Sequence, residues 1–248
     1  MSMEIRTAPD ASRGLALLRA VLVVFAAFLA VIVVGSIGTG LLADAGLGQD
    51  SLAYRVASSA LAPIGFGVGL AGYLAASDDW ALLRDHLRRP TRRDLAYVAA
   101  GVVVILVGAV AAGQLLAALG VEVAQNRVIA AGEDDPTFYL YMIPVSLLLV
   151  GPFEELVFRG AVQGVLRRAF RPTAAVATAS AIFGLIHLPA LLSSGSKLSY
   201  VFVAATLGLV LGASYELTGN VVVPAAVHGT YNAVLFGVQY AGATGLVG

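Results

Sequence analysis

Long runs of apolar residues alternate with short polar segments along the whole chain. The runs cover residues 17–42, 56–76, 95–119, 138–167, 173–192, 200–217 and 221–240. A helix needs about 20 mostly apolar residues to cross the hydrocarbon core of a bilayer, and each run is close to that length or longer. The fourth run is the longest and fits either one tilted helix or a span followed by a further helix. The pattern therefore predicts an all-α fold, a polytopic membrane bundle of seven or eight transmembrane helices.

Composition supports the membrane interpretation. Of the 248 residues, 59% are hydrophobic and 12% are charged, against about 25% charged in a typical soluble domain, and the mean hydropathy is +0.88. So few charges exclude an ordinary soluble enzyme, and so much apolar sequence excludes disorder. The formal net charge of zero gives no sign of a nucleic-acid partner. We expect a single integral membrane domain over residues 1–248, whose partner is the lipid bilayer.

Arginines predict the orientation of the helices. Three groups of arginines fall on the same side if every run crosses the membrane: Arg6 and Arg13; Arg84, Arg88, Arg89, Arg92 and Arg93; Arg167, Arg168 and Arg171. Positive residues accumulate in cytoplasmic loops. We therefore expect a multi-pass protein, of the plasma membrane, with a cytoplasmic N-terminus. The one long loop on the other side, 120–137, could cap a site or lie along the interface.

A few polar and ionisable residues interrupt the apolar runs, and they gather in the C-terminal half. Ionisable groups at membrane depth are costly and usually functional. The residues are Glu154, Glu155, Arg159, His187, His228 and Asn232. For either histidine alone, a hydrogen bond to a neighbouring carbonyl is as good an interpretation as chemistry, but their coincidence favours one polar site. His86 lies in the arginine-rich loop, where we expect it to be solvated.

Helical spacing divides these residues into roles. Glu155 and Arg159 are four apart with the acid first, which favours a structural ion pair. Glu154 is rotated by about 100° from its neighbour on an α-helix, has no local cation, and is the better candidate for a general base. His228 and Asn232 are also four apart and share a helix face. Gln163 and Tyr231 could line the cavity, although packing explains them better, and Glu216 is expected to snorkel or cap rather than to take part in catalysis.

Three segments resemble the motifs of the CAAX-prenyl-endopeptidase and bacteriocin-processing (CPBP, or abortive-infection) family of intramembrane proteases. They are EELVFRG at 154–160, FGLIH at 183–187 and HGTYN at 228–232. The family pattern is a Glu-Glu pair followed by Arg, then Phe-x3-His, then His-x3-Asn. The resemblance covers about residues 140–236, and the helices of residues 1–135 have no assigned role. Each motif is weak alone, but the three in order on hydrophobic segments are specific.

The resemblance implies an endopeptidase that hydrolyses a peptide bond of a membrane-associated substrate. It assigns water activation to Glu154 and His187, oxyanion binding to His228 and Asn232, and a supporting role to Glu155 and Arg159. Prenylated CAAX proteins are the best-known substrates of the wider family, but nothing in the sequence identifies them here. The alternative is a non-enzymatic membrane carrier or a bacteriocin self-immunity scaffold that uses the same polar cavity.

The need for a metal is left open by the residue types. Glu154, His187 and His228 could hold Zn²⁺ with a free position for water, as in catalytic zinc sites, and the family is often described as metalloendopeptidases. The sequence has no HExxH helix. Glutamate-activated water explains the same residues without a metal, so we expect no obligatory cofactor, with zinc as the alternative.

Overall fold

The computed structural model describes residues 12–192 and 194–247, and within these ranges the regular structure is helical. Arg6 lies outside the described residues. The elements, which include the π-helical stretches η1 and η2 and the 3₁₀ turn η3, are α1 Arg13–Asp44, α2 Leu52–Ser77, α3 Ala81–Arg84, α4 Arg92–Ala118, α5 Arg127–Ala130, α6 Thr137–Val145, η1 Ser146–Val150, α7 Gly151–Glu155, η2 Leu156–Gln163, α8 Gly164–Arg167, α9 Pro172–Leu185, η3 Leu188–Ala190, α10 Lys197–Thr218 and α11 Val222–Ala243.

Six helical segments of the described chain are long and apolar enough to cross a membrane. They confirm an all-helical, multi-pass membrane protein, whereas the count of seven or eight spans is not confirmed. The helix outside this set is α11, which has 22 residues. It is long enough but less apolar, because His228, Asn232 and Gln239 interrupt its valines and alanines.

The fourth apolar run is one long helix rather than a span followed by a separate helix. It extends from Thr137 to Arg167 through α6, η1, α7, η2 and α8. Pro152 follows the first π-helical stretch, and a proline inside a helix has no N–H to donate to the preceding turn. Single π-helical turns are frequent at functional sites. We call Thr137–Arg167 the central helix.

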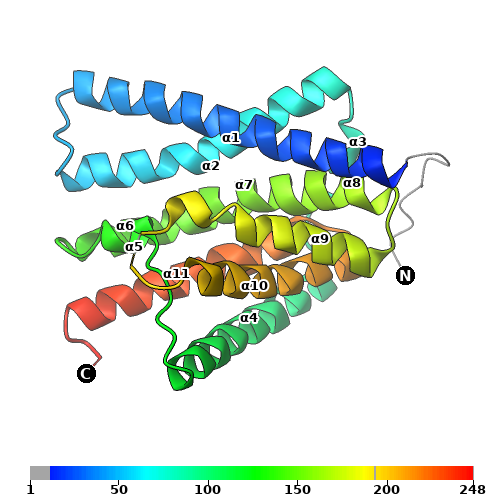
Figure 1. The fold of residues 1–248 in the computed structure, drawn as a ribbon. Helices are drawn as coiled ribbons and strands as arrows, with labels where there is room; N and C mark the ends of the chain where they lie inside the picture. Colours follow the sequence, from blue (N-terminus) through cyan, green and yellow to red (C-terminus); the bar gives the residue numbers. More distant parts are fainter. Residues whose placement is uncertain (1–11, 193, 248) are drawn as a thin grey trace.

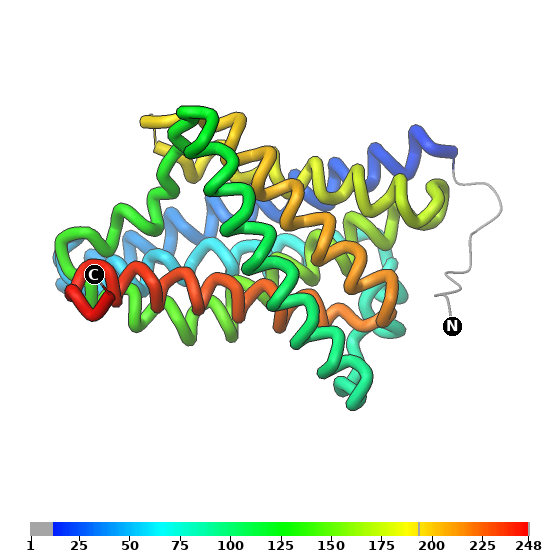
Figure 2. Tube along the Cα trace, turned by 90° about the horizontal axis from the view of Figure 1, so that it is seen from below, coloured from blue at the N-terminus to red at the C-terminus, as the bar shows by residue number. Residues whose placement is uncertain are grey.

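Figure 1 shows the antiparallel hairpin of α1 and α2 on one side of the central helix, and α9, α10, α11 and α4 on the other. Viewed from below, α4 crosses α11 obliquely (Figure 2). The largest apolar cluster joins α1, α2, the central helix and α9. A smaller one joins α4, α10 and α11. The central helix is therefore covered from both sides.

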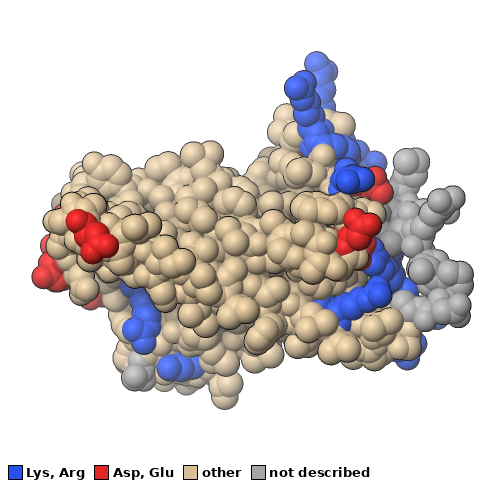
Figure 3. Space-filling model, turned by 90° about the horizontal axis from the view of Figure 1, so that it is seen from above, with Lys and Arg blue, Asp and Glu red and all other residues tan. Residues whose placement is uncertain are grey.

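Charged residues gather at the two ends of the bundle and leave an apolar belt between them (Figure 3). The arginine-rich end contains the turns that follow α2, α8 and α10. There Arg168 donates to both carboxylate oxygens of Asp79, at 2.5 and 2.7 Å. This hydrogen-bonded pair raises the pKa of Arg168 above its ordinary value. The pair fastens the end of α2 to the end of the central helix.

His86 was expected to be solvated, but it is only partly exposed and packs against other elements. Its ring lies 5.6 Å from that of Tyr215, centroid to centroid, and its carbonyl oxygen accepts a hydrogen bond of 2.8 Å from Val221 N. A ring that is half apolar and half polar suits a position where a loop packs on helix ends. His86 therefore docks the loop before α4 onto the turn between α10 and α11.

The close packing of α1 against α2 depends on small residues. A Cβ atom built on Gly69 would lie 2.5 Å from Ala27 Cα, which is backbone and cannot move aside. A Cβ on Gly72, in the same helix, would meet nothing within 4 Å. Small residues allow membrane helices to approach to this distance, where dispersion contacts between the two backbones are made.

We expect Gly69→Ala to lower the free energy of unfolding by about 1–3 kcal/mol, because an overpacked contact forces the two helices apart. The matched control Gly72→Ala should leave stability unchanged or raise it slightly, since alanine favours helix. Thermal unfolding in detergent measures both. Equal effects of the two variants would refute the close approach of the helices.

Candidate active site

The centre of the candidate site is a buried carboxylate between two basic side chains. Glu155 accepts a hydrogen bond of 2.9 Å from Arg159 Nε on one oxygen and one of 2.9 Å from His228 Nδ1 on the other. The side chains of Glu155 and Arg159 are 0% exposed, and that of His228 is 8% exposed. A buried charge needs such pairing to offset its lost hydration. The i, i+4 pair expected from the sequence is thus extended to a third residue on another helix.

Helix α11 reaches Glu155 because two glycines remove the side chains at its crossing with the central helix. A Cβ on Gly151 would lie 2.5 Å from Ala225 O and 2.8 Å from Gly229 N. A Cβ on Gly229 would lie 3.0 Å from Ser146 O. The two backbones are therefore in direct contact one turn from the site. This contact brings His228 of α11 within hydrogen-bond distance of Glu155.

Phe183 of α9 packs against both histidines and the arginine. Its ring centroid is 4.8 Å from that of His187 and 5.7 Å from that of His228, both edge to face. The guanidinium carbon of Arg159 lies 5.1 Å from the same centroid, a cation–π contact. The Phe-x3-His motif therefore contributes an aromatic ring that joins the three motifs in space.

His187 lies two residues beyond the end of α9, within the candidate span Pro172–Ala190. Its Nδ1 is 2.7 Å from the carbonyl oxygen of Phe183, and since a carbonyl only accepts, this nitrogen carries the proton. The helix ends at Leu185 because Pro189 has no N–H to donate to the carbonyl oxygen of Leu185, four residues earlier. The other ring nitrogen, Nε2, is left as an acceptor. The hydrogen bond to the carbonyl oxygen of Phe183 therefore fixes the orientation of the His187 ring.

Glu154 and Asn232 lie beside this network without joining it. Glu154 Oε2 is buried and has no hydrogen-bond partner among the described residues. Asn232 is half-buried, one turn beyond His228 on α11, and its side chain makes no hydrogen bond within the described part of the chain. Both groups are therefore available to a ligand or to water, whereas Glu155 is not.

The arrangement does not fit a preformed zinc site. No three histidine, aspartate or glutamate side chains of the described residues are grouped closely enough to hold a metal ion. The carboxylate of Glu155 is occupied by Arg159 and His228. Catalytic zinc needs three protein ligands that converge on one point. Glu154, His187 and His228 do not provide this, so no step below involves a metal.

The loop at 120–137 covers the end of the site that His187 occupies. Tyr200 lies 5.9 Å from His187, ring centroid to centroid, and its hydroxyl accepts a hydrogen bond of 3.1 Å from Asn126 Nδ2. Leu192 N donates to Gln125 O at 2.9 Å. The sequence left open whether this loop caps the site or lies along the interface. The structure shows a cap held on the turn between α9 and α10.

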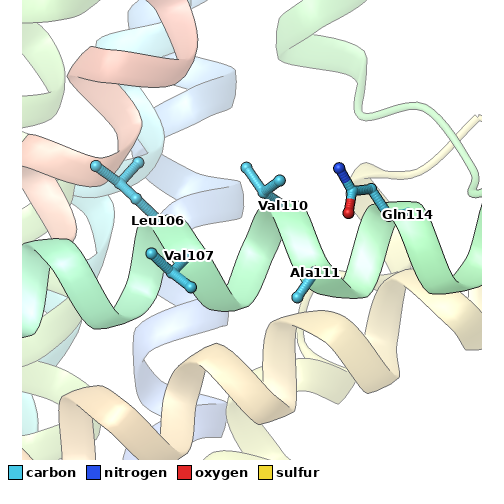
Figure 4. A pocket seen from close by; sticks show the side chains of 5 residues that line it. All are labelled: Leu106, Val107, Val110, Ala111 and Gln114. Atoms are coloured by element: carbon cyan, nitrogen blue, oxygen red, sulfur yellow. The ribbon is translucent and has the colours of Figure 1, made fainter.

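Two apolar grooves on the outer surface contain none of the site residues. One, of about 350 Å³, lies along α4 and is lined by Leu106, Val107, Val110, Ala111 and Gln114 (Figure 4). The other, of about 360 Å³, lies between α1 and α2. Their linings are mostly apolar and belong to α1, α2 and α4, three of the helices long and apolar enough to cross a membrane, so lipid chains are the expected neighbours.

Some of the residues around the site could not be predicted from the motifs. Tyr200 and Asn126 are far from the motifs in the sequence, and only the fold shows their contact. Gln163 is fully buried, as expected for a residue that packs, and it is also hydrogen-bonded to α10. The sequence did contain a signal that Gln163 lies on the same helix face as the ion pair, since it follows Arg159 by four residues and Glu155 by eight.

The fold and these contacts define a multi-pass membrane protein with a buried glutamate–histidine site. Residues 136–234 match the family model described as Type II CAAX prenyl endopeptidase Rce1-like. This segment, which contains all three motifs, therefore belongs to the CAAX-protease (CPBP) family, a family of proteases, and the resemblance seen in the sequence is confirmed. No curated protein and no solved structure matches the chain.

We expect Arg159→Met to lower the free energy of unfolding by about 3–5 kcal/mol, because Glu155 would keep a buried charge without its cation. The double variant Glu155→Gln/Arg159→Met should recover most of that loss, since the remaining groups are neutral and glutamine can still accept from His228. Reversible unfolding in mixed detergent micelles measures the free energies. Additive losses in the double variant would contradict direct coupling of the two residues.

Proposed function

We propose that the protein is an intramembrane endopeptidase that hydrolyses a peptide bond of a membrane-associated substrate. Glu154 and His187 activate water, and His228 and Asn232 stabilise the oxyanion. The observation that carries the proposal is the difference in hydrogen bonding between the two adjacent glutamates. Both oxygens of Glu155 accept hydrogen bonds, from Arg159 and His228, while Glu154 keeps a buried oxygen without a partner among the described residues. A general base needs such a free oxygen within reach of its water.

The hydrolytic step follows from the hydrogen bonds of the two histidines. Water donates one hydrogen bond to Glu154 and the other to Nε2 of His187, whose Nδ1 donates to Phe183 O. Glu154 takes the proton as the water oxygen bonds to the carbonyl carbon of the substrate. The protonated Glu154 then returns the proton to the amide nitrogen, and the C–N bond breaks. The products are a carboxylic acid and an amine, without a covalent enzyme intermediate.

The oxyanion of the tetrahedral intermediate needs two donors. Because Nδ1 of His228 donates to Glu155, Nε2 donates only when the imidazole is protonated, and the carboxylate of Glu155 stabilises that charge. The amide of Asn232, one turn further on α11, is the second donor. Donors fixed in advance in a site that excludes water are worth several kcal/mol in the transition state. Arg159 and Glu155 thus act by orienting His228.

The substrate class follows from the family and from the bilayer. A membrane-associated peptide or protein segment reaches a site between membrane helices without leaving the lipid, and CAAX-type substrates carry a prenyl group. Prenylation of the substrate is part of the proposal.

We expect the purified protein to cleave members of a membrane-peptide library in detergent with a chelator present. Glu154→Gln and His187→Ala should each lower kcat by about 10²–10⁴-fold, and Asn232→Ala by about 10²–10³-fold. The matched control is Asp44→Asn, an exposed acidic residue at the end of α1, a helix that contributes no site residue. It should retain full activity.

The proposal fails if the wild type cleaves nothing or if the Glu154 and His187 variants cleave as well as the control. Loss of activity to the chelator, with restoration by zinc, would replace the glutamate-activated water by a metal mechanism. Cleavage that needs a prenyl group on the peptide would narrow the substrate class.

We also propose that the arginine-rich end faces the cytoplasm, with the protein in the plasma membrane and the N-terminus inside, as positive residues accumulate on that side. The chain has no native cysteine, so single cysteines report their side cleanly. An impermeant thiol reagent added to intact cells should label Asp134→Cys and leave Arg89→Cys unlabelled until the cells are opened. The reverse pattern would invert the topology.

A further inference from the structure

A row of polar side chains continues from the candidate site along one face of the central helix. Glu155, Arg159, Gln163 and Arg167 follow one another at intervals of four residues. The first three are fully buried, and the side chain of Arg167 is 12% exposed. A π-helix closes its hydrogen-bonded turn one residue later than an α-helix, so residues four apart stay closer to one line. The winding of η2 therefore aligns this row.

Helix α10 contacts the part of the row that lies nearest the arginine-rich end of the bundle. Gln163 Nε2 donates to Glu216 Oε1 at 2.9 Å and to Gly212 O at 3.2 Å. Arg167 Nε lies 3.0 Å from the same Glu216 carboxylate, which is 15% exposed. These bonds join the interior to the arginine-rich end of the bundle. Glu216, expected to snorkel or cap, instead closes the row at that end.

The middle of the row contains buried polar atoms without partners among the described residues. They are Nη1 and Nη2 of Arg159, Oε1 of Gln163 and Oγ of Ser180. Arg159 stacks on Phe183, and a Cβ on Gly208 would meet both Phe183 and Ser180. One turn along α10, a Cβ on Gly212 would meet Gln163. Ser180 therefore lies between the level of Arg159 and the level of Gln163.

Donors and acceptors are matched within this group. The guanidinium nitrogens only donate, the amide oxygen only accepts, and the hydroxyl does both. A buried guanidinium with unsatisfied N–H groups is strongly unfavourable, and internal water normally satisfies such groups with two to four hydrogen bonds. The ligand that fits this chemistry is water, since the carboxylate of Glu155 pairs with Nε of Arg159 and leaves Nη1 and Nη2 without partners among the described residues.

We propose that Arg159, Ser180, Gln163 and Glu216 line a water passage between the arginine-rich end of the bundle and the candidate site. The ion pair of Arg167 with Glu216 closes its outer end, and its opening admits water. One role of the passage, the supply of the water that hydrolysis consumes, rests on the proposed function. The passage itself does not rest on the proposed function, because the side chains that line it lie along the row from Glu155 towards the arginine-rich end of the bundle.

The passage can be tested by thiol chemistry in the full-length protein, without a substrate. Ser180→Cys replaces a hydroxyl by a thiol of similar shape, in a chain with no other cysteine. Ser214→Cys is the matched control, because Ser214 is also a buried serine but donates to Leu211 O within its own helix. Both variants are reacted with methanethiosulfonate ethylammonium, a small, charged, water-soluble reagent. The rate of modification is followed by mass spectrometry.

We expect the cysteine at position 180 to react at least about tenfold faster than the one at 214, because thiol modification needs water access. Adding Gln163→Leu to the first variant should slow its reaction several-fold, as an apolar side chain obstructs the passage. Equal rates at the two positions, no reaction at position 180, or no effect of Gln163→Leu would each overturn the proposal. Thermal unfolding confirms that each variant is folded before it is labelled.

Failure of the water passage and failure of the proposed function are distinguishable. Labelling at position 180 without any peptide cleavage keeps the passage and removes the endopeptidase. Cleavage with an unreactive cysteine at position 180 keeps the endopeptidase and removes the passage.

Discussion

The pairing of the Glu155 carboxylate with two basic side chains is the interaction on which the rest of the site depends. The carboxylate is fully buried among membrane helices and pairs with Arg159 on its own helix and with His228 on α11. Each partner alone would leave a buried charge or a misdirected imidazole. Together they hold two helices in register and set the direction of His228. The energetic cost of burying charges is therefore offset by pairing, and the geometry of the site follows from that pairing.

The backbone around Glu155 allows both of these pairings. Glycines at 151 and 229 let α11 touch the central helix, and π-helical turns before and after α7 change the winding on both sides of the glutamate pair. Two adjacent glutamates on a helix cannot share one environment, since they are rotated by about 100° from each other. Glu155 is paired, whereas Glu154 keeps an oxygen without a partner among the described residues. The rotation thereby places two identical residue types in different surroundings.

Much of this could be predicted from the sequence. The apolar runs predict helices because the bilayer imposes a length and a polarity on them, and the spacing of Glu155 and Arg159 predicts their pairing. The link from Glu155 to His228 could not be predicted, because it joins residues that are 73 apart. The end of α9 before Pro189 could have been read locally, whereas the cap formed by Asn126 and Tyr200 depends on packing between distant loops. Local rules thus describe the helices, and contacts over long sequence separations assemble the site.

The ring of Phe183 has a consequence for the movement of protons. It contacts both His187 and His228, and an aromatic ring has no atom that can relay a proton. Within the described chain the Nδ1 atoms of the two imidazoles bond to different partners, a backbone carbonyl and a carboxylate. A proton held on one imidazole is thus not passed directly to the other, and the two sides of the site can hold opposite protonation states at the same time.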